Sequence, residues 1–484
     1  MKKLLEFALL FFCLIPLFTI NVKTSHDWGD DFAQYVHQAK NINEGISQNN
    51  TGYIFNENCF TGPIAYPVGF PLLLSPVVKF WGLDFYHFNL LQSLFLTLSC
   101  LVGFFMLRSH TSFFTSFFVS LIVAYNPMLL NFKTEIISDL SFTFFSMLCL
   151  FLMQKKQNLV FSVILGLLMG FSIHIRSVGV LLVITYLFNQ LFLQESIRHF
   201  SFKAHFKTGI TLLTCFLFYL GVKLFWPCNT NYPGIFETEH FWTTVNEHLS
   251  YNMYHLSMFF RGYPIESYWY IGLMASASFL VFAFLGAFHF YSENKKSIYL
   301  FYLPIYILMV ISYKFSHAGI RFLYPVLFLL FLFAVIGLKK AFSPWLAKQQ
   351  WLAVLFGSLV LFSYHEEVMR IQKREPEIVD GPQSKTAIET FNYINSHLSP
   401  NAVVAFDKPR ALCLYTHINS FAIFPAATKE EITRDLNKFH ATYYLTNETQ
   451  STNEIKNHPL DDSSKFEMVY SNPAFKLFQI RSKL

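Results

Sequence analysis

Charged side chains are scarce in this sequence. Asp, Glu, Lys and Arg make up 14% of its 484 residues, against about a quarter in an ordinary soluble domain. Hydrophobic residues reach 53%, and 59 of them are Phe. So little charge and so much apolar surface exclude a soluble enzyme, and lipid is the expected main solvent.

The apolar residues gather in uninterrupted runs whose length suits a membrane-crossing helix, which needs about 20 residues. We expect eleven such spans, followed by a more polar tail. They are centred on residues 3–20, 86–107, 113–130, 136–153, 159–175, 177–193, 209–226, 269–290, 298–313, 322–338 and 347–363. The first run has no small-x-small cleavage site before Asp27, so we expect an uncleaved anchor and not a signal peptide.

Basic residues form small clusters between the spans and no extended patch. The net charge is +6, but the clusters lie in short loops on one side of the expected topology, while the opposite loops are longer and poorer in Lys and Arg. This is the positive-inside pattern, and it excludes nucleic-acid binding as the reason for the charge. With Lys2 and Lys3 in the cytoplasm, an odd number of spans places the C-terminal tail outside.

The expected fold is a polytopic α-helical membrane protein with a small C-terminal α/β soluble domain. Residues 1–363 form the transmembrane domain, including an outer loop at 21–85 with an interfacial helix over 66–82, and residues 364–484 form the extracytoplasmic domain. In the tail the patterns predict a helix over 385–398, strands over 403–406, 411–415, 421–424 and 441–445, and a second helix capped by Thr428 and Glu431.

Cysteine is also sparse, with seven residues. Four lie within expected spans and behave as small apolar side chains. Cys59, Cys228 and Cys413 lie outside the spans, so a disulfide between Cys59 and Cys228 is one reading, and three free thiols are the preferred one.

Three carboxylates follow the first span, at Asp27, Asp30 and Asp31. A carboxylate held near another carboxylate at a lipid surface tends to have a raised pKa, which suits a general base that deprotonates a hydroxyl. The alternative is that these acids only mark the outer end of a helix.

The order of these features resembles the GT-C glycosyltransferases, in the branch of the protein O-mannosyltransferases and the lipid A aminoarabinose transferases. The likeness rests on Asp30-Asp31 followed by Tyr35, on Tyr66-Pro67-x-Gly69-x-Pro71, on Arg176-Ser-Val-Gly179 at a span boundary, and on the order of spans and tail. The family usually has Asp-Glu where this chain has Asp30-Asp31.

The resemblance implies that Asp30 is the catalytic base and that Asp31 supports it, with Asp27 as the fallback. It also implies an acid near the start of the fourth span that holds the acceptor or the sugar. Asp139 is the first choice for that role, with Glu135 and Tyr35 as further candidates. The alternative for Asp139 and Glu135 is that they are helix-end and interface charges.

A lipid phosphodiester donor requires cations that bind the phosphate and stabilise it as a leaving group. Arg176, between two spans with almost no loop around it, is the leading candidate, followed by Arg321 and Arg261. Arg176 could instead be a snorkelling anchor. The spacing of His240, His248 and His255 has no metal-ligand signature, so we expect no required metal and no cofactor beyond the donor.

The sequence therefore predicts an inverting glycosyltransferase that transfers a hexose or pentose from a polyprenyl-phosphate donor to a hydroxyl of a lipid, glycan or protein acceptor. The expected location is the bacterial inner membrane, with the active site and tail on the periplasmic side. A transporter or flippase of lipid-linked saccharides is the alternative, but it would favour charges at mid-membrane or broken helices. A structural protein with a sensory tail would leave the acidic pair and Arg176 without a role.

Overall fold

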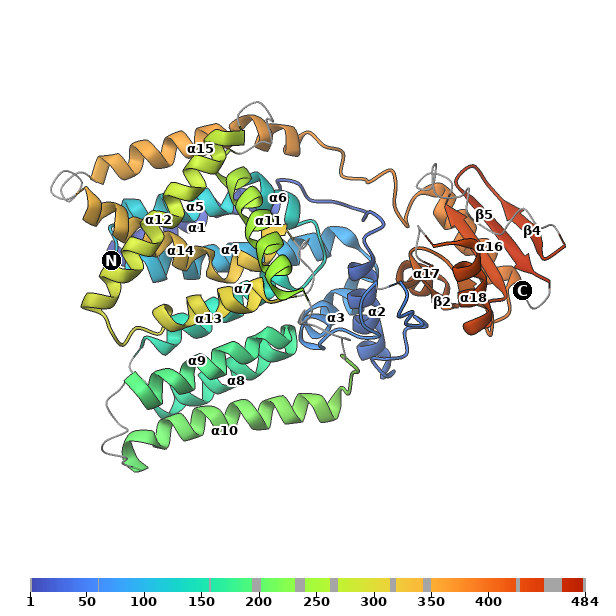
Figure 1. Ribbon diagram of the computed structural model, residues 1–484, viewed down its shortest axis with the longest axis horizontal. Helices are drawn as coiled ribbons and strands as arrows, with labels where there is room; N and C mark the ends of the chain where they lie inside the picture. Colours follow the sequence, from blue (N-terminus) through green and yellow to red (C-terminus); the bar gives the residue numbers. More distant parts are fainter. Residues whose placement is uncertain are drawn as a thin grey trace. The chain divides into compact units, whose positions relative to one another are not determined.

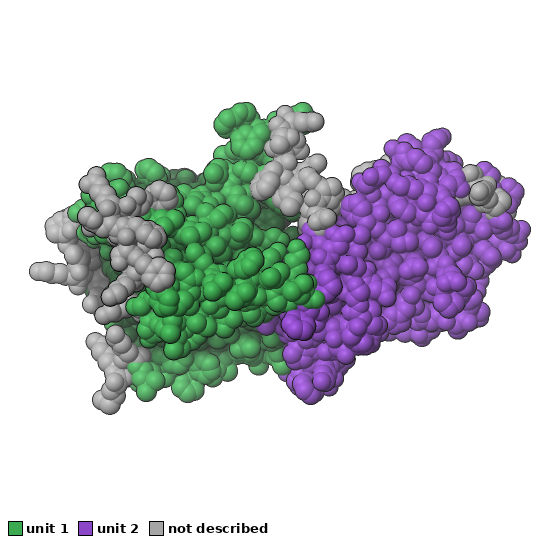
Figure 2. Space-filling model, turned by 90° about the horizontal axis from the view of Figure 1, so that it is seen from below, with its two compact units in different colours: residues 1–22, 89–224, 233–374 green, residues 23–88, 225–232, 375–484 purple. Residues whose placement is uncertain are grey.

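The computed structural model is mostly helical, and its contacts divide it into two compact units (Figure 2). Unit 1 comprises residues 1–22, 89–224 and 233–374, and unit 2 comprises residues 23–88, 225–232 and 375–484. The structure describes residues 2–59, 61–155, 158–193, 202–230, 240–261, 269–313, 319–342, 350–423, 427–447 and 464–481.

The described residues of unit 1 are mostly α-helical (Figure 1). The helices are α1 (Lys2–Leu14), α4 (Phe85–Arg108, whose first turn belongs to unit 2), α5 (Phe113–Ala124), α6 (Pro127–Phe132), α7 (Asp139–Met153), α8 (Leu159–Ile175), α9 (Val180–Phe188), α10 (Phe202–Phe225), α11 (Phe241–Arg261), α12 (Trp269–Glu293), α13 (Tyr299–Ile311), α14 (Tyr324–Ala341) and α15 (Gln350–Gln372). Short helical turns precede or follow several of them, η1 (Ile15–Phe18), η2 (Ser177–Gly179), η3 (Asn189–Leu193) and η5 (Gly319–Leu323).

Five helices within the described ranges are long and apolar enough to cross a membrane, which agrees with an integral membrane protein. They cover Phe85–Arg108, Phe206–Phe225, Tyr270–Glu293, Ile320–Ala341 and Trp351–Gln372. The other six expected spans coincide with shorter apolar helices, so eleven crossings stay a prediction. One expected span, 113–130, was wrong as a single helix: Asn126 caps a new helix at Pro127, and proline cannot continue the preceding one.

Helices α12 and α14 pack with their backbones unusually close. An added Cβ on Gly286 would lie 1.8 Å from the carbonyl oxygen of Phe333, and one on Gly337 would lie 2.0 Å from that of Phe282. Only glycine fits at these two positions, and the absence of side chains there brings the two apolar helices together.

Unit 2 combines helices with one sheet (Figure 1). Its helices are α2 (Asp30–Glu44), α3 (Gly69–Trp81), α16 (Lys385–His397), α17 (Pro409–Thr416) and α18 (Lys429–Lys438), and its strands are β1 (Val403–Ala405), β2 (Asn419–Phe421), β3 (Tyr443–Asn447), β4 (Phe466–Ser471) and β5 (Phe475–Ile480). The sheet order is β2-β1-β3-β5-β4, with β1 parallel to β2 and β3, and β5 antiparallel to β3 and β4.

The loop after the first helix is joined to this sheet. Tyr53 forms a parallel bridge with Ser420 on β2, and Asp435 of α18 accepts hydrogen bonds of 2.9 Å from Asn56 and Asn58. The sequence assigned the 21–85 loop to the transmembrane domain and began the tail at 364. By contacts, residues 23–88 group with residues 375–484, and backbone hydrogen bonds link the two segments, from Thr24 to Pro376 and from Ile54 to Ser420.

The two helices predicted for the C-terminal tail are present in the structure. Helix α16 matches the predicted 385–398 helix, and the capping box of Thr428 and Glu431 is present at the start of α18. The predicted strand over 411–415 was wrong, since these residues lie in α17, which Pro409 starts at its first position. Cys59 has a free thiol, in agreement with the preferred reading.

Candidate active site

The acidic pair occupies the first turn of α2. Gly29 precedes the helix, and Asp30 and Asp31 are its first two residues, where the exposed backbone N–H groups and the helix dipole favour negative charge. Phe32, Val36 and Ala39 recur at helical spacing and are buried, so this face of α2 is fixed in the interior of unit 2. Gly45, with φ +68°, ends the helix.

The counter-ion of the pair is Arg410, on α17. Its side chain is completely buried; its Nε lies 3.6 Å from Oδ2 of Asp30, and its Nη1 lies 3.4 Å from Oδ1 of Asp31. Nη1 also donates to the Tyr66 hydroxyl at 3.1 Å, and Nη2 donates to the Pro63 carbonyl oxygen at 2.6 Å. One guanidinium therefore binds two carboxylates, a phenol and a backbone carbonyl.

Two tyrosine rings and a glycine enclose this guanidinium. Its carbon lies 4.8 Å from the ring centre of Tyr53 and 5.1 Å from that of Tyr66, within the range of cation–π attraction. Gly62 has a φ of +128°, and a Cβ added there would lie 2.4 Å from Nη2 of Arg410. Only glycine therefore fits at this position, because the backbone has a positive φ and because a side chain would collide with Arg410.

Asp30 is the carboxylate best suited to accept a proton. Its side chain is 11% exposed, and neither of its oxygens has a hydrogen-bond partner of ordinary geometry among the described residues. Burial raises the pKa of Asp30 to about 6; the Arg410 guanidinium opposes this shift and the Asp31 carboxylate adds to it. The Asp30 carboxylate is therefore largely ionised at neutral pH, and neither of its oxygens is occupied by a hydrogen bond of ordinary geometry.

Asp27, the fallback candidate, is different. Its side chain is 54% exposed, and Oδ1 lies 3.0 Å from Nδ1 of His26 and accepts a 2.8 Å hydrogen bond from the Gly29 amide. The hydrogen bond with His26 lowers the pKa of Asp27. A carboxylate with a lowered pKa is a weaker base, so the geometry favours Asp30 over Asp27.

Asp31 and Tyr35 have supporting positions. Asp31 is 37% exposed and accepts hydrogen bonds from Arg410 and from the Tyr66 hydroxyl. Tyr35 is buried and stacks on Tyr66 with ring centres 4.3 Å apart, and its ring also meets Phe70 edge-on. Tyr35 thus fixes the tyrosine that contacts the acidic pair.

Unit 1 brings together a second set of predicted residues. Asp139 is the first residue of α7, and its Oδ1 lies 2.5 Å from Nη1 of Arg176 at the end of α8. Arg176 and Arg321 both lie over the ring of Phe322, at 5.1 and 5.3 Å from its centre. Two guanidiniums thus lie over one aromatic ring, and one of them, Arg176, is paired with Asp139; guanidiniums are the groups that bind phosphate best.

Glu135 lies in the turn before α7, which the polar face of α4 holds in place. Gln92 donates to the backbone carbonyl oxygens of Glu135 and Ile137, at 3.0 and 2.8 Å. In the same turn, Lys133 is fully buried, and its ammonium donates to Ser93 Oγ at 3.0 Å. Burial lowers the pKa of Lys133 to about 7. Lys133 is therefore a buried amine of unit 1 and not a charge at the membrane surface.

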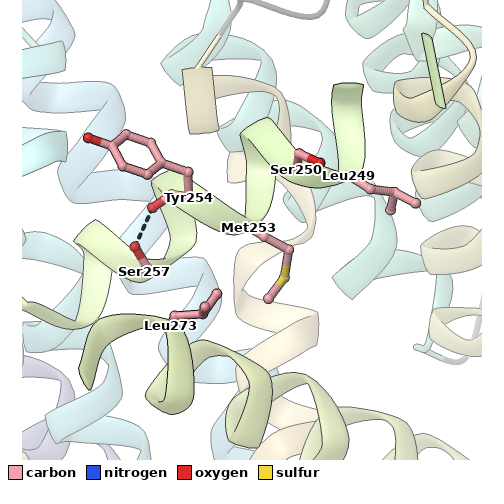
Figure 3. Close-up of a pocket in the computed structure, with 6 residues that line it drawn as sticks. All are labelled: Leu249, Ser250, Met253, Tyr254, Ser257 and Leu273. Atoms are coloured by element: carbon pink, nitrogen blue, oxygen red, sulfur yellow. Dashed lines mark hydrogen bonds between the residues drawn. The ribbon is translucent and has the colours of Figure 1, made fainter. Parts of the chain in front are cut away.

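The third cation candidate, Arg261, ends α11, and its side chain lies outside the described residues. Helix α11 itself was not predicted, because its sequence is too polar for a span. With α12 it borders an apolar cavity of about 410 Å³, whose lining residues are Leu249, Ser250, Met253, Tyr254, Ser257 and Leu273 (Figure 3).

The arrangement of helices and sheet defines the class of fold. Comparison with solved structures gives similarity over nearly the whole chain to GT-C glycosyltransferases, which confirms the resemblance seen in the sequence at the level of fold. No model of a known protein family matches the sequence, and no curated protein sequence matches it.

Solved structures of two proteins carry the comparison. ArnT from Cupriavidus metallidurans, bound to undecaprenyl phosphate, has a TM-score of 0.56 and 14% identity over 97% of both chains, and its apo state gives the same TM-score at 13% identity. The Archaeoglobus fulgidus oligosaccharyltransferase, in a complex with Zn and sulfate, has a TM-score of 0.59 and 10% identity over 91% of this chain and 68% of its own.

Proposed function

We propose that this chain is an inverting membrane glycosyltransferase that transfers a sugar from a polyprenyl phosphate to an acceptor hydroxyl. The observation that carries the proposal is Asp30: a nearly buried carboxylate whose oxygens have no hydrogen-bond partner of ordinary geometry and whose pKa is about 6. A buried carboxylate of this kind is costly to keep, and it is typical of a group that exchanges a proton. The shared fold with ArnT, whose structure holds undecaprenyl phosphate, supports a lipid-phosphate donor.

In this mechanism Asp30 takes the proton of the acceptor hydroxyl as the oxygen attacks the anomeric carbon. The bond from that carbon to the phosphate oxygen breaks on the opposite side, so the configuration inverts and polyprenyl phosphate leaves with the bonding electrons. Arg176 and Arg321 supply positive charge to the phosphate. Asp139 orients Arg176 through their 2.5 Å contact.

The test uses purified protein in lipid nanodiscs, a panel of radiolabelled undecaprenyl-phosphate hexoses and pentoses, and a membrane extract as the source of acceptors. Transfer of label from at least one donor into extract material, with undecaprenyl phosphate released, is the expected result. Movement of intact labelled lipid across the bilayer without release of undecaprenyl phosphate would instead indicate a flippase.

Arg176→Ala is expected to weaken donor use by about 2 kcal/mol, or about 30-fold in the donor KM, since charge-assisted hydrogen bonds to phosphate are lost. Donor titrations at saturating acceptor measure this change. Arg108→Ala is the matched control, because Arg108 also pairs with a largely buried carboxylate, Glu6, at 3.0 Å. Equal donor KM values for the parent and Arg176→Ala would make Arg176 an anchor and transfer the role to Arg321.

We also propose that transfer needs no resident divalent metal. Arg410 already provides the positive charge that two adjacent carboxylates would otherwise seek from a cation. Activity is expected to persist at the parental rate after dialysis against EDTA, measured with the same labelled donor. Loss of activity on chelation with recovery on adding Mg²⁺, Mn²⁺ or Zn²⁺ would contradict this.

The proposed sidedness places residues 365–484 and the acceptor site on the periplasmic side of a bacterial inner membrane. Eleven crossings that begin at a cytoplasmic Lys2-Lys3 end require this, as does the basic character of the short loops on the other side. Alkaline phosphatase fused after Leu484 is expected to be active. A fluorescent reporter that matures only in the cytoplasm is expected to stay dark at the same position, and the reverse result would overturn the topology.

A further inference from the structure

The two carboxylates of the acidic pair are not held alike, although they are neighbours in the sequence. Asp31 accepts hydrogen bonds from the Tyr66 hydroxyl and from Arg410. Asp30 has the charge of Arg410 beside it, at 3.6 Å, with Lys408 and the backbone amide of Ala411 as weaker influences, and neither of its oxygens has a hydrogen bond of ordinary geometry among the described residues. The donors therefore go to one acid, and the lone pairs stay available on the other.

Arg410 is held by further contacts in addition to its ion pairs with the two acids. The Pro63 carbonyl accepts from Nη2, and the rings of Tyr53 and Tyr66 lie near the guanidinium carbon. Because the side chain is completely buried, these contacts are shielded from solvent. Together they hold the guanidinium between the two acids, 3.6 Å from Asp30 and 3.4 Å from Asp31.

We propose that Arg410 is a positioning residue of the transfer reaction: it anchors Asp31 and lies beside Asp30 without occupying its oxygens, so that Asp30 alone serves as the base. This proposal rests on the proposed function and deepens it, because it assigns residues 375–484 the role of positioning the base. Arg410 acts through Asp30 and contacts neither donor nor acceptor in this scheme.

The ionisation of Asp30 then depends on a small set of groups. Among the described residues, the side chains that act on it electrostatically are those of Arg410, Lys408, Asp31, Tyr53, Cys59 and Cys413, and the backbone amide of Ala411 adds to them. Only two of the six are cations, and Arg410 is the one whose effect on Asp30 is larger. Without the charge of Arg410, burial and the Asp31 carboxylate would still raise the pKa of Asp30. Asp30 would therefore ionise at a higher pH.

The experiment measures kcat/KM from about pH 4.5 to about pH 10 with the labelled undecaprenyl-phosphate sugar that the parent uses. A base is active when ionised, so the parental rate is expected to rise with pH through about 6. In Arg410→Gln this rising limb of the pH–rate profile is expected to move up by about one to three pH units. In Arg410→Lys, which keeps the charge but not the planar fork, the limb is expected to stay while kcat falls by up to about 10²-fold at an unchanged donor KM.

Arg481→Gln is the matched control, because Arg481 is an exposed residue of the same unit that pairs with Glu467. It is expected to keep the parental profile. An unshifted limb in folded Arg410→Gln would overturn the proposal. If that variant does not accumulate, a parental kcat in Arg410→Lys would overturn it. A parent that transfers no sugar from any donor would refute the proposed function instead, so the two failures are distinguishable.

Discussion

Asp30→Asn is expected to lower the rate of sugar transfer by about 10²- to 10⁴-fold while donor binding is retained, because the amide has nearly the same size but cannot take the acceptor proton. The residue starts α2 in an interior position, and its oxygens make no hydrogen bonds of ordinary geometry that the substitution would break. Single-turnover rates with saturating labelled donor measure the chemical step, and retention of the donor on nanodiscs measures binding.

Asp27→Asn is the control for this substitution. Asp27 lies three residues earlier, is largely exposed and has a lowered pKa, so its amide variant is expected to turn over near the parental rate. Asp31→Asn distinguishes the two members of the pair. If Asp30→Asn stays active and Asp31→Asn does not, then the base is Asp31; activity in both single variants and in the double variant would refute a catalytic role for the pair.

Gly62→Ala is expected to destabilise the protein by about 3 kcal/mol or more, and to abolish most of its activity. The new methyl group would lie 2.4 Å from Nη2 of Arg410 and 2.9 Å from the Tyr66 hydroxyl, and the backbone φ of +128° is itself strained for alanine. A guanidinium at a surface would swing aside at little cost. This one is buried beside two carboxylates, and disrupting a buried ion pair costs about 3–5 kcal/mol.

Thermal unfolding in detergent, followed by intrinsic fluorescence, measures the effect. Gly45→Ala separates backbone strain from the clash, because Gly45 also has a positive φ, +68°, but an added Cβ there meets nothing within 4 Å. It is expected to cost about 1 kcal/mol. If the two variants melt at the same temperature, Arg410 moves freely and is not the rigid anchor described above.

Much of unit 1 could be predicted because hydropathy alone decides it. A run of about 20 apolar residues in lipid has to form a helix, so every expected span coincides with helical residues. The prediction failed where local chemistry overrides composition: the Asn126-Pro127 pair breaks one run into two helices, and α11 is too polar for hydropathy to detect.

The candidate site was only half predictable. Asp30 and Asp31 stand out in a sequence so poor in charge, but their counter-ion lies 379 residues from Asp31. The segment after Pro409 has the composition of a strand, and nothing local indicates that it forms a helix with Arg410 turned inward. A fully buried arginine is rare, and its burial depends on partners from distant parts of the chain, which a single sequence does not reveal.

The joining of residues 23–88 to residues 375–484 has a consequence for biosynthesis. The ribosome completes the first segment about 290 residues before the second begins, which at 5–20 residues per second is a delay of about 15 to 60 s. During that time the edge at Tyr53 has no strand to pair with, and Asn56 and Asn58 lack their acceptor on Asp435. The early loop is therefore a nascent segment exposed to proteases and chaperones until the last quarter of the chain emerges.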